Sequence, residues 1–196
     1  MKDPQKPTEA TKSKKPIKKV IQRDHTEDLV DHYWGSIGYV FGLIKASELK
    51  AGLILSFYGI LMNLIYQHLG MFFQTGSNQV ILLLLLGLWL LCTGVSIYFS
   101  IRCFMPRIEG KFDKNIFFFG DVISKFGNIQ EFSRTFYTIS LNEEELFLQL
   151  GQQIFIISKI ADYKFRNVNR SIRFLALGLL LLFAMAAYYT LLVITR

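Results

Sequence analysis

Apolar residues in this chain form long uninterrupted runs, and these alternate with segments in which apolar residues are spaced as on a helix. Residues 51–101 contain no Asp, Glu, Lys or Arg, and residues 174–195 form a second charge-free run. A helix needs about 20 apolar residues to cross a hydrocarbon core of roughly 30 Å. The first run is therefore long enough for two crossings, divided by the turn signal TGSN at residues 75–78, and the second is long enough for one.

Residues 29–50 carry apolar side chains at steps of three and four, which predicts an amphipathic helix that runs directly into the first span. Acidic residues stand near its beginning and Lys45 and Lys50 near its end, an order that suits the helix dipole. The buried stripe is expected to contain Leu29, Tyr33, Ile37, Val40, Ile44 and Ser47.

Two more helical stripes lie in the polar region between the second and third spans. The first predicts one helix over residues 119–139, with Phe119 and Phe126 facing inward. The second begins at Asn142, a candidate N-cap, and meets no proline before the C-terminus, so we expect one helix from Glu143 onwards. Its buried stripe is expected to contain Leu146, Leu150, Ile154, Ile157 and Ala161.

These patterns predict an all-α membrane protein with three transmembrane helices and a small cytoplasmic helical bundle, whose last helix is continuous with the third span. The N-terminal segment has many lysines and almost no apolar residues, so it is expected to be disordered. The expected organisation is a disordered basic tail at 1–28, a cytoplasmic amphipathic helix at 29–50, a two-span hairpin at 51–101, a cytoplasmic helical sensor region at 102–173 and a third transmembrane helix at 174–196.

The positive charges predict how the chain is oriented in the membrane. Of the 22 Lys and Arg residues, ten lie in residues 1–50, eleven in residues 102–173 and one at Arg196. Cytoplasmic segments next to membrane spans are enriched in Lys and Arg. We therefore expect the N-terminus and the middle region in the cytoplasm and the C-terminus outside. The basic tail is expected to approach anionic lipid rather than a nucleic acid polymer, because no aromatic residues are interleaved with its lysines.

The sequence contains no recognisable catalytic constellation. His25, His32 and His68 are scattered without the spacing of metal ligands, and there is no phosphate-binding P-loop or nucleophile elbow. The carboxylates at residues 143–145 stand at a helix start, where they complement the dipole. Cys92 is interpreted, with the second cysteine of the chain, as an unpaired thiol. We therefore expect neither an enzyme nor a metal or other cofactor.

Two short segments are candidates for binding a small anionic ligand. In DYKFRNVNR (residues 162–170), Lys164 and Arg166 could hold a phosphate beside the ring of Tyr163, although basic residues also commonly flank a span on its cytoplasmic side. The other segment, FFFGD, contains Phe119, Gly120 and Asp121. The Asp121 carboxylate at a helix start would repel a phosphate, so stacking and a hydrogen bond to a hydroxyl are its expected roles. Alternatively, residues 117–119 pack the bundle or lie against the membrane interface.

Polar and small residues inside the spans are candidates for contacts between spans in a homo-oligomer. Carboxamides can form hydrogen bonds between helices, and glycines allow helices to approach closely. The candidates are Asn63, Gln67, Gly87 and Gly94.

Several short motifs, taken in order, resemble the Pycsar transmembrane effector family. They are ASELKAGLIL at residues 46–55, NIFFFGDV at 115–122, EF at 131–132 and LNEEELFLQLGQQIFIISKIADYKFRNVNRSIRF at 141–174, and the resemblance covers residues 31–192. Glu48 stands where the family often has Asp, and the lysine-rich tail extends beyond the family core. The resemblance implies a bacterial anti-phage effector in the inner membrane, activated by cyclic CMP or cyclic UMP from a partner cyclase. It also implies that the effector impairs that membrane, which causes abortive infection.

The sequence therefore favours two functions. The first is a nucleotide-gated effector that disrupts the lipid bilayer. The second is a non-gated membrane scaffold whose cytoplasmic bundle docks a protein partner. A channel or transporter is disfavoured, because the spans carry no charged residue that would mark an ion pathway.

Overall fold

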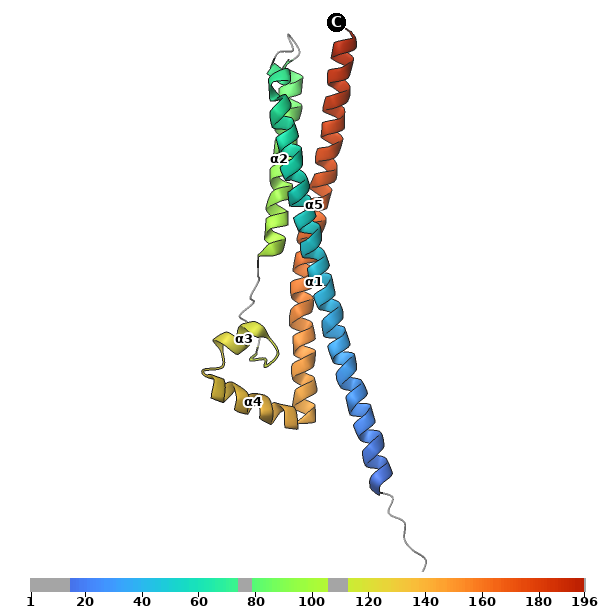
Figure 1. Cartoon of the computed structure of the whole chain (residues 1–196), viewed down its shortest axis with the longest axis vertical. Helices are drawn as coiled ribbons and strands as arrows, with labels where there is room; N and C mark the ends of the chain where they lie inside the picture. The colour runs from blue at the N-terminus through green and yellow to red at the C-terminus, as the bar shows by residue number, and fades with distance from the viewer. Residues whose placement is uncertain (1–14, 74–78, 106–112, 196) are drawn as a thin grey trace, which may run out of the picture.

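The computed structural model describes residues 15–73, 79–105 and 113–195. Within these residues the chain is all-helical and has no strands. Figure 1 shows the long helices forming a rod, with short helices beside its lower half. The helices are α1 (Lys15–Phe73), α2 (Gln79–Phe104), α3 (Phe119–Ser124), α4 (Ile129–Leu141) and α5 (Glu143–Ile194). The predicted turn at residues 75–78 and residues 1–14 of the predicted tail lie outside the described residues, and α1 begins at Lys15 rather than at residue 29.

Helices α1 and α5 run in the same direction, cross near the middle of the rod and separate toward its lower end (Figure 1). The Thr26 hydroxyl donates to Glu143 at 2.9 Å, across 117 residues of sequence. The Lys164 ammonium donates to Glu48 at 2.7 Å, across 116 residues. The two contacts are 22 residues apart on α1, and the difference in residue number between their partners is nearly the same. The register between α1 and α5 is therefore constant over this stretch.

The core between α1 and α5 confirms both stripes that the sequence predicted for these helices. A parallel pair buries side chains in which steps of three and four alternate. Its buried members are Ile37, Val40, Leu150, Ile157 and Ala161, with Tyr33, Ile44, Leu146 and Ile154 packed against them.

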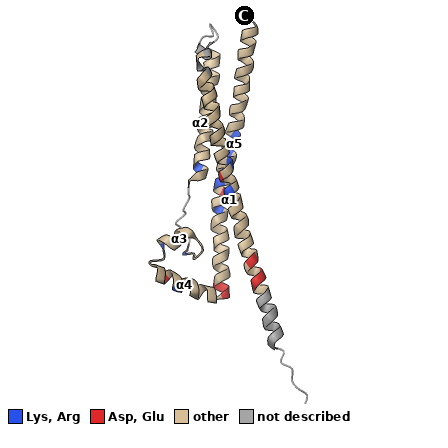
Figure 2. Cartoon of the chain, viewed as in Figure 1, with Lys and Arg blue, Asp and Glu red and all other residues tan. Residues whose placement is uncertain are grey.

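Helix α2 returns through the upper half of the rod and packs against both α1 and α5. All its buried positions except Cys92 alternate steps of four and three, the spacing of a left-handed helical bundle: Leu82, Leu86, Trp89, Thr93, Ser96, Ser100 and Cys103. Three helices of the chain, α1, α2 and α5, are long and apolar enough to cross a membrane. Figure 2 shows the upper half of the rod without charged side chains among the described residues.

The three long helices meet where their side chains are small. We call this place the waist and define it by Ser47, Ala51, Ser96, Ser100 and Ser171, each at most 1% exposed. The Ser96 hydroxyl donates to the Ser171 carbonyl at 2.9 Å, and the Ser100 and Ser171 hydroxyls lie 2.7 Å apart. Small residues let the helix backbones approach closely, and paired hydroxyls leave no unsatisfied polar group at these contacts.

The prediction of one helix over residues 119–139 was wrong. The segment forms α3 and α4, separated at residues 125–128. Asn128 begins α4 as its N-cap, because its side-chain oxygen accepts a hydrogen bond from the Glu131 amide at 2.8 Å. Gly127, a poor helix former, directly precedes it. The apolar spacing continued across the break, since the Phe126 ring still packs on Phe132 with 5.2 Å between centroids.

Helix α5 continues without interruption from Glu143 to Ile194. Asn142 is its N-cap, as predicted, and accepts a hydrogen bond from the Glu145 amide at 3.4 Å. At 1.5 Å per residue, the 52 residues of this helix extend about 78 Å. One rigid element therefore reaches from the lower end of the rod to its upper end.

Candidate ligand-binding site

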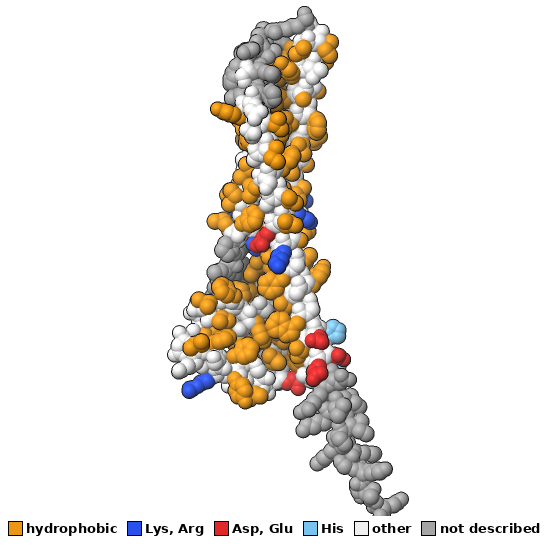
Figure 3. All heavy atoms as spheres, in the orientation of Figure 1, with side chains coloured by type: hydrophobic (Ala, Val, Ile, Leu, Met, Phe, Trp, Pro, Cys, Tyr) orange, Lys and Arg blue, Asp and Glu red, His pale blue; other side chains and the backbone are white. Residues whose placement is uncertain are grey.

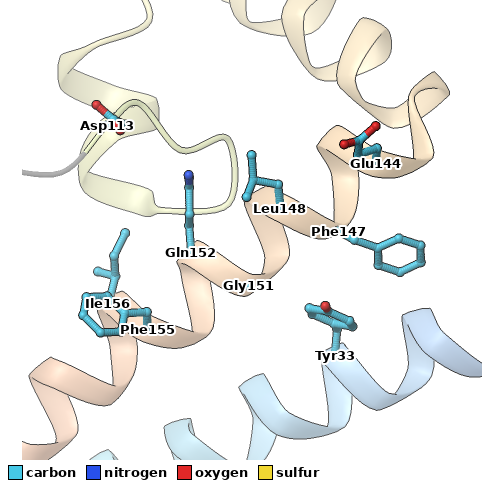
Figure 4. Close-up of a pocket in the computed structure, with 9 residues that line it drawn as sticks. All are labelled: Tyr33, Asp113, Glu144, Phe147, Leu148, Gly151, Gln152, Phe155 and Ile156. Atoms are coloured by element: carbon cyan, nitrogen blue, oxygen red, sulfur yellow. The ribbon is translucent and has the colours of Figure 1, made fainter.

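A cavity of about 630 Å³ follows the lower part of α5 between α1 and the segment that precedes α3. We call it the trough. Figure 4 shows Tyr33 entering from α1 on one side and Asp113 standing on the other. The remaining lining residues all belong to α5: Glu144, Phe147, Leu148, Gly151, Gln152, Phe155 and Ile156.

Gly151 forms the floor of the trough. A Cβ atom placed on it would meet only Tyr33 Cε1, at 3.8 Å, an ordinary van der Waals contact. Glycine costs stability in the middle of a helix, so the missing side chain here leaves space at the expense of helix propensity. The Phe147 ring lies 5.3 Å from the Tyr33 ring and makes an aromatic wall at one side of that space.

Acidic side chains line the trough, and one basic side chain lies next to the ring of Phe155. The carboxylates of Glu144 and Asp113 line it, and Glu144 is eleven residues, or about 16 Å, from Phe155 on the same helix. At the Phe155 end, the Lys159 ammonium lies 5.2 Å from the centroid of the Phe155 ring. The trough can thus take a flat ring whose hydrogen-bond donors face these carboxylates, with any anionic group directed out of the lining toward Lys159.

A buried hydrogen-bond network fixes the arm, our name for residues 113–142, to α5. The Asn115 side chain donates to the Gln149 carbonyl at 2.7 Å, and the Gln149 side-chain oxygen accepts from the Ile116 amide at 3.1 Å. The Asp121 carboxylate accepts from the Asn115 amide at 3.0 Å and pairs with Lys125 at 2.9 Å. Asp113 therefore reaches the trough on a segment that this network holds in place.

The FFFGD segment is largely structural. Asp121 is 4% exposed and used by the network, so its carboxylate has no room for the predicted ligand hydroxyl. Phe119 is 77% exposed, which makes the prediction that it faces inward wrong. A Cβ on Gly120 would come within 2.8 Å of the Phe118 ring, so that ring already covers the backbone where a ligand was expected. Phe117 does pack the bundle, 5.7 Å from Trp34.

Lys164 is buried, with 5% of its surface exposed, and its ammonium has two partners. It donates at 2.7 Å to Glu48 of α1 and at 2.7 Å to the Cys103 carbonyl near the end of α2. We call this contact the clamp. It joins all three long helices directly below the charge-free segments. A phosphate could reach Lys164 only by displacing Glu48.

Arg166 and Tyr163 also have partners within the chain. Arg166 pairs on the helix surface with Asp162 one turn earlier, and its Nε donates to that carboxylate at 2.9 Å. This hydrogen bond lowers the pKa of the Asp162 carboxyl. The Tyr163 hydroxyl accepts from Arg102 of α2 at 3.0 Å.

The structure does not bring the two predicted ligand segments together. Asp121 lies beside Asn115 and thus near Gln149, and Lys164 is fifteen residues, or about 22 Å, further along α5. The sequence interpretation missed the trough, although a glycine inside the strongly periodic helix at position 151 was a usable signal. Of the serines at the waist it placed Ser47 in a buried stripe but missed Ser96, Ser100 and Ser171, and the spacing of α2 could have revealed the first two of these.

The four candidates for span association all lie on the outside of the rod. Asn63 and Gln67 are exposed on α1, and Gly87 and Gly94 are exposed on α2. None of them contributes to the packing of the three helices within one chain. Among the described residues, no group of three His, Cys, Asp or Glu side chains could hold a metal ion, and the side chain of His68 lies outside the described part.

Comparison with known proteins places these features in one family. The family described as "PycTM: Pycsar effector protein domain" matches residues 32–191, which contain the trough, the clamp and most of the three long helices. The Pycsar effector protein PtPycTM of Propioniciclava tarda is 25% identical over 158 residues, which cover 79% of this chain and 77% of that protein. No solved structure matches the chain.

Proposed function

Because the chain belongs to the PycTM family of Pycsar effectors, we propose that it is a membrane effector of a bacterial anti-phage system. In this proposal a partner cyclase makes cyclic CMP or cyclic UMP upon infection. The effector binds that nucleotide, impairs the inner membrane, and the infected cell dies before phage are released. The family match over residues 32–191 carries this proposal, since it includes both the membrane helices and the region below them.

The trough is where we place the nucleotide. A pyrimidine ring would lie over Gly151 beside the rings of Tyr33 and Phe147, where stacking contributes about 1–3 kcal/mol per base. The amino or hydroxyl groups of the nucleotide would donate to Glu144, and the cyclic phosphate would lie toward Lys159. This placement differs from the phosphate site expected at Lys164 and Arg166, whose side chains pair with Glu48 and Asp162.

The long helix α5 supplies the connection from ligand to membrane. Its lower turns line the trough, its middle carries Lys164 of the clamp, and its last turns form the expected third span. A ligand changes the arrangement of the spans only as far as it binds one arrangement better than the other. A nucleotide that widens the trough between α1 and α5 would favour an arrangement in which the clamp is open. No catalytic group is needed for this action.

The orientation follows from the charges. With the N-terminus and the arm in the cytoplasm, the trough faces the compartment in which a cyclase would release the nucleotide. The upper ends of α1, α2 and α5 then lie at the far side of the inner membrane. The charge-free helices contact lipid, and copies of the chain associate within the bilayer.

Cells that express the protein with and without a cognate cyclase test the proposed function. The dye uptake of the cells and their membrane potential are measured after the cyclase is induced. We expect dye entry and depolarisation only when both proteins are present. No nucleotide-dependent change would contradict the effector function. If, in addition, calorimetric titration of the purified protein showed no binding of cyclic CMP or cyclic UMP, the scaffold function would be favoured.

A further inference from the structure

One face of α1 carries polar and small residues at the depth where lipid tails would surround it. Ser56, Gly59, Asn63, Gln67 and Gly70 follow each other at steps of three and four, and all five are exposed. In the same stretch, α1 packs into the rod with a different face, which contains Ile54 and Tyr58. The polar face therefore points away from α2 and α5. We call it the carboxamide face.

Asn63 lies deep in the expected span. It follows Ala51, the first residue of the charge-free run, by twelve residues, which is about 18 Å along the helix. The hydrocarbon core is roughly 30 Å thick, so the carboxamide is near its middle. Within the part of the chain that the structure describes, no hydrogen-bond partner is recorded for the Asn63 or Gln67 side chain. Lipid tails can supply none, and an unpaired amide in an apolar medium costs several kcal/mol.

The chemistry of this face matches a second copy of the same chain. A carboxamide has both donors and an acceptor, so two of them can pair with each other. Copies inserted in the same orientation hold Asn63 at the same depth, so the groups meet without adjustment along the membrane normal. Gly59 and Gly70 lie one and two turns away, where they allow the two backbones to approach. Figure 3 shows that apolar side chains dominate the upper half of the rod, as a lipid-facing surface requires.

We propose that two copies of the chain associate in the membrane through the carboxamide face of α1, with Asn63 of one copy paired to Asn63 of the other. This inference rests on one part of the proposed function, the placement of α1 across the membrane. The pairing itself does not require a nucleotide.

Disulfide crosslinking in isolated membranes tests the pairing. Gly59→Cys places a thiol on the carboxamide face with no atom within 4 Å of the new Cβ, so the fold tolerates it. Ala176→Cys is the matched control, because it lies 117 residues later at the same depth on an exposed position of α5. The parent protein controls for Cys92 and Cys103, which are both buried. Crosslinked dimer is quantified by non-reducing gel electrophoresis after mild oxidation without nucleotide.

We expect oxidation to crosslink the Gly59→Cys protein several-fold more than the Ala176→Cys protein and not to crosslink the parent. Adding Asn63→Leu to Gly59→Cys should raise the apparent dissociation constant of the dimer about five- to thirty-fold, the range expected for one hydrogen bond between membrane helices. Equal crosslinking at both positions, or no effect of Asn63→Leu, would overturn the proposal, and so would a monomer crosslinked only to another protein. The calorimetric titration with cyclic CMP or cyclic UMP measures nucleotide binding, and its result does not depend on whether the dimer crosslinks.

Discussion

The upper and lower halves of the rod share α1 and α5 but are held together differently. Directly above the clamp, at the waist, α1, α2 and α5 pack through small side chains, and the Ser171 hydroxyl pairs with those of Ser96 and Ser100. Further up, large apolar side chains fill the space between the three helices. Below it, α1 and α5 form a pair, the arm is attached through Asn115 and Gln149, and the trough remains open. Tight packing transmits a displacement, whereas a half-open pair can respond to a ligand. This difference fits the proposed function, in which the lower half binds the ligand and the upper half acts on the membrane.

Breaking the clamp, which joins the two halves, should cause the largest loss of stability. Lys164→Ala leaves the Glu48 carboxylate without its cation and the Cys103 carbonyl without its donor. Removing one partner of a buried pair costs about 3–5 kcal/mol, and the 37% exposure of the Glu48 side chain reduces this to about 2–3 kcal/mol. A fall in the thermal unfolding midpoint in detergent measures the loss.

Two variants control for the clamp. Arg166→Ala removes a cation two residues away whose pair with Asp162 is on the surface, so we expect almost no change in stability. Combining Lys164→Met with Glu48→Gln removes both charges and should recover part of the lost stability. If Lys164→Ala were as stable as Arg166→Ala, the clamp would not join the two halves.

Overfilling the waist should be nearly as damaging. Ser171 is fully buried between Ser96 and Ser100, so Ser171→Leu forces the helices apart and leaves hydroxyls unpaired. We expect a loss of about 1–3 kcal/mol in the free energy of unfolding. Ser171→Ala keeps the space and should cost only about 0.6 kcal/mol. Similar losses for the two variants would show that packing at the waist is loose.

Detaching the arm should have a smaller and local effect. Asn115→Ala removes the hydrogen bond to the Gln149 carbonyl and the bond that the Asn115 side chain accepts from the Phe117 amide at 2.9 Å. The Gln149 carbonyl lies within α5 and keeps its intrahelical bond, so each lost hydrogen bond costs only about 0.5–1.5 kcal/mol. Hydrogen exchange of α3 should become faster, and exchange in α2 should not change. Faster exchange throughout the rod would instead mean that the arm supports the membrane helices.

Filling the trough should produce the smallest change in stability, with the opposite sign. Gly151→Ala improves helix propensity by about 0.5–1 kcal/mol and meets Tyr33 only at ordinary contact distance. The variant should therefore be slightly more stable and bind cyclic nucleotide more weakly, which a melting curve and a calorimetric titration measure. Unchanged binding would move the ligand site away from the floor of the trough.

The parts of the fold that the sequence predicted are those that a helical period reports directly. Ile37, Val40, Leu150 and Ile157 recur at three- and four-residue steps and form the core that was expected. The same period hid the break before α4, because Phe126 and Phe132 stay in contact across it. A period records which side chains share a face and says little about where the backbone leaves the helix.

The candidate site could be predicted only in part, for a different reason. Whether Lys164 faces solvent depends on Glu48, 116 residues away, and on a backbone carbonyl of α2. Neither partner is visible in the local pattern that made this lysine look like a phosphate ligand. The trough is a space, and a space depends on how α1, α5 and the arm sit together. In the local sequence, the glycine at position 151 was the one feature that pointed to the trough.

Leakage from liposomes tests most directly whether the lower half senses a nucleotide and the upper half disrupts the membrane. Purified protein and its Gly151→Leu variant are reconstituted with an entrapped dye, and cyclic CMP or cyclic UMP is added from the side that the trough faces. We predict that one of the two nucleotides releases dye through the parent protein, and that Gly151→Leu, folded and inserted equally well, releases much less. Equal release from both proteins, or none from the parent at saturating nucleotide, would contradict the account.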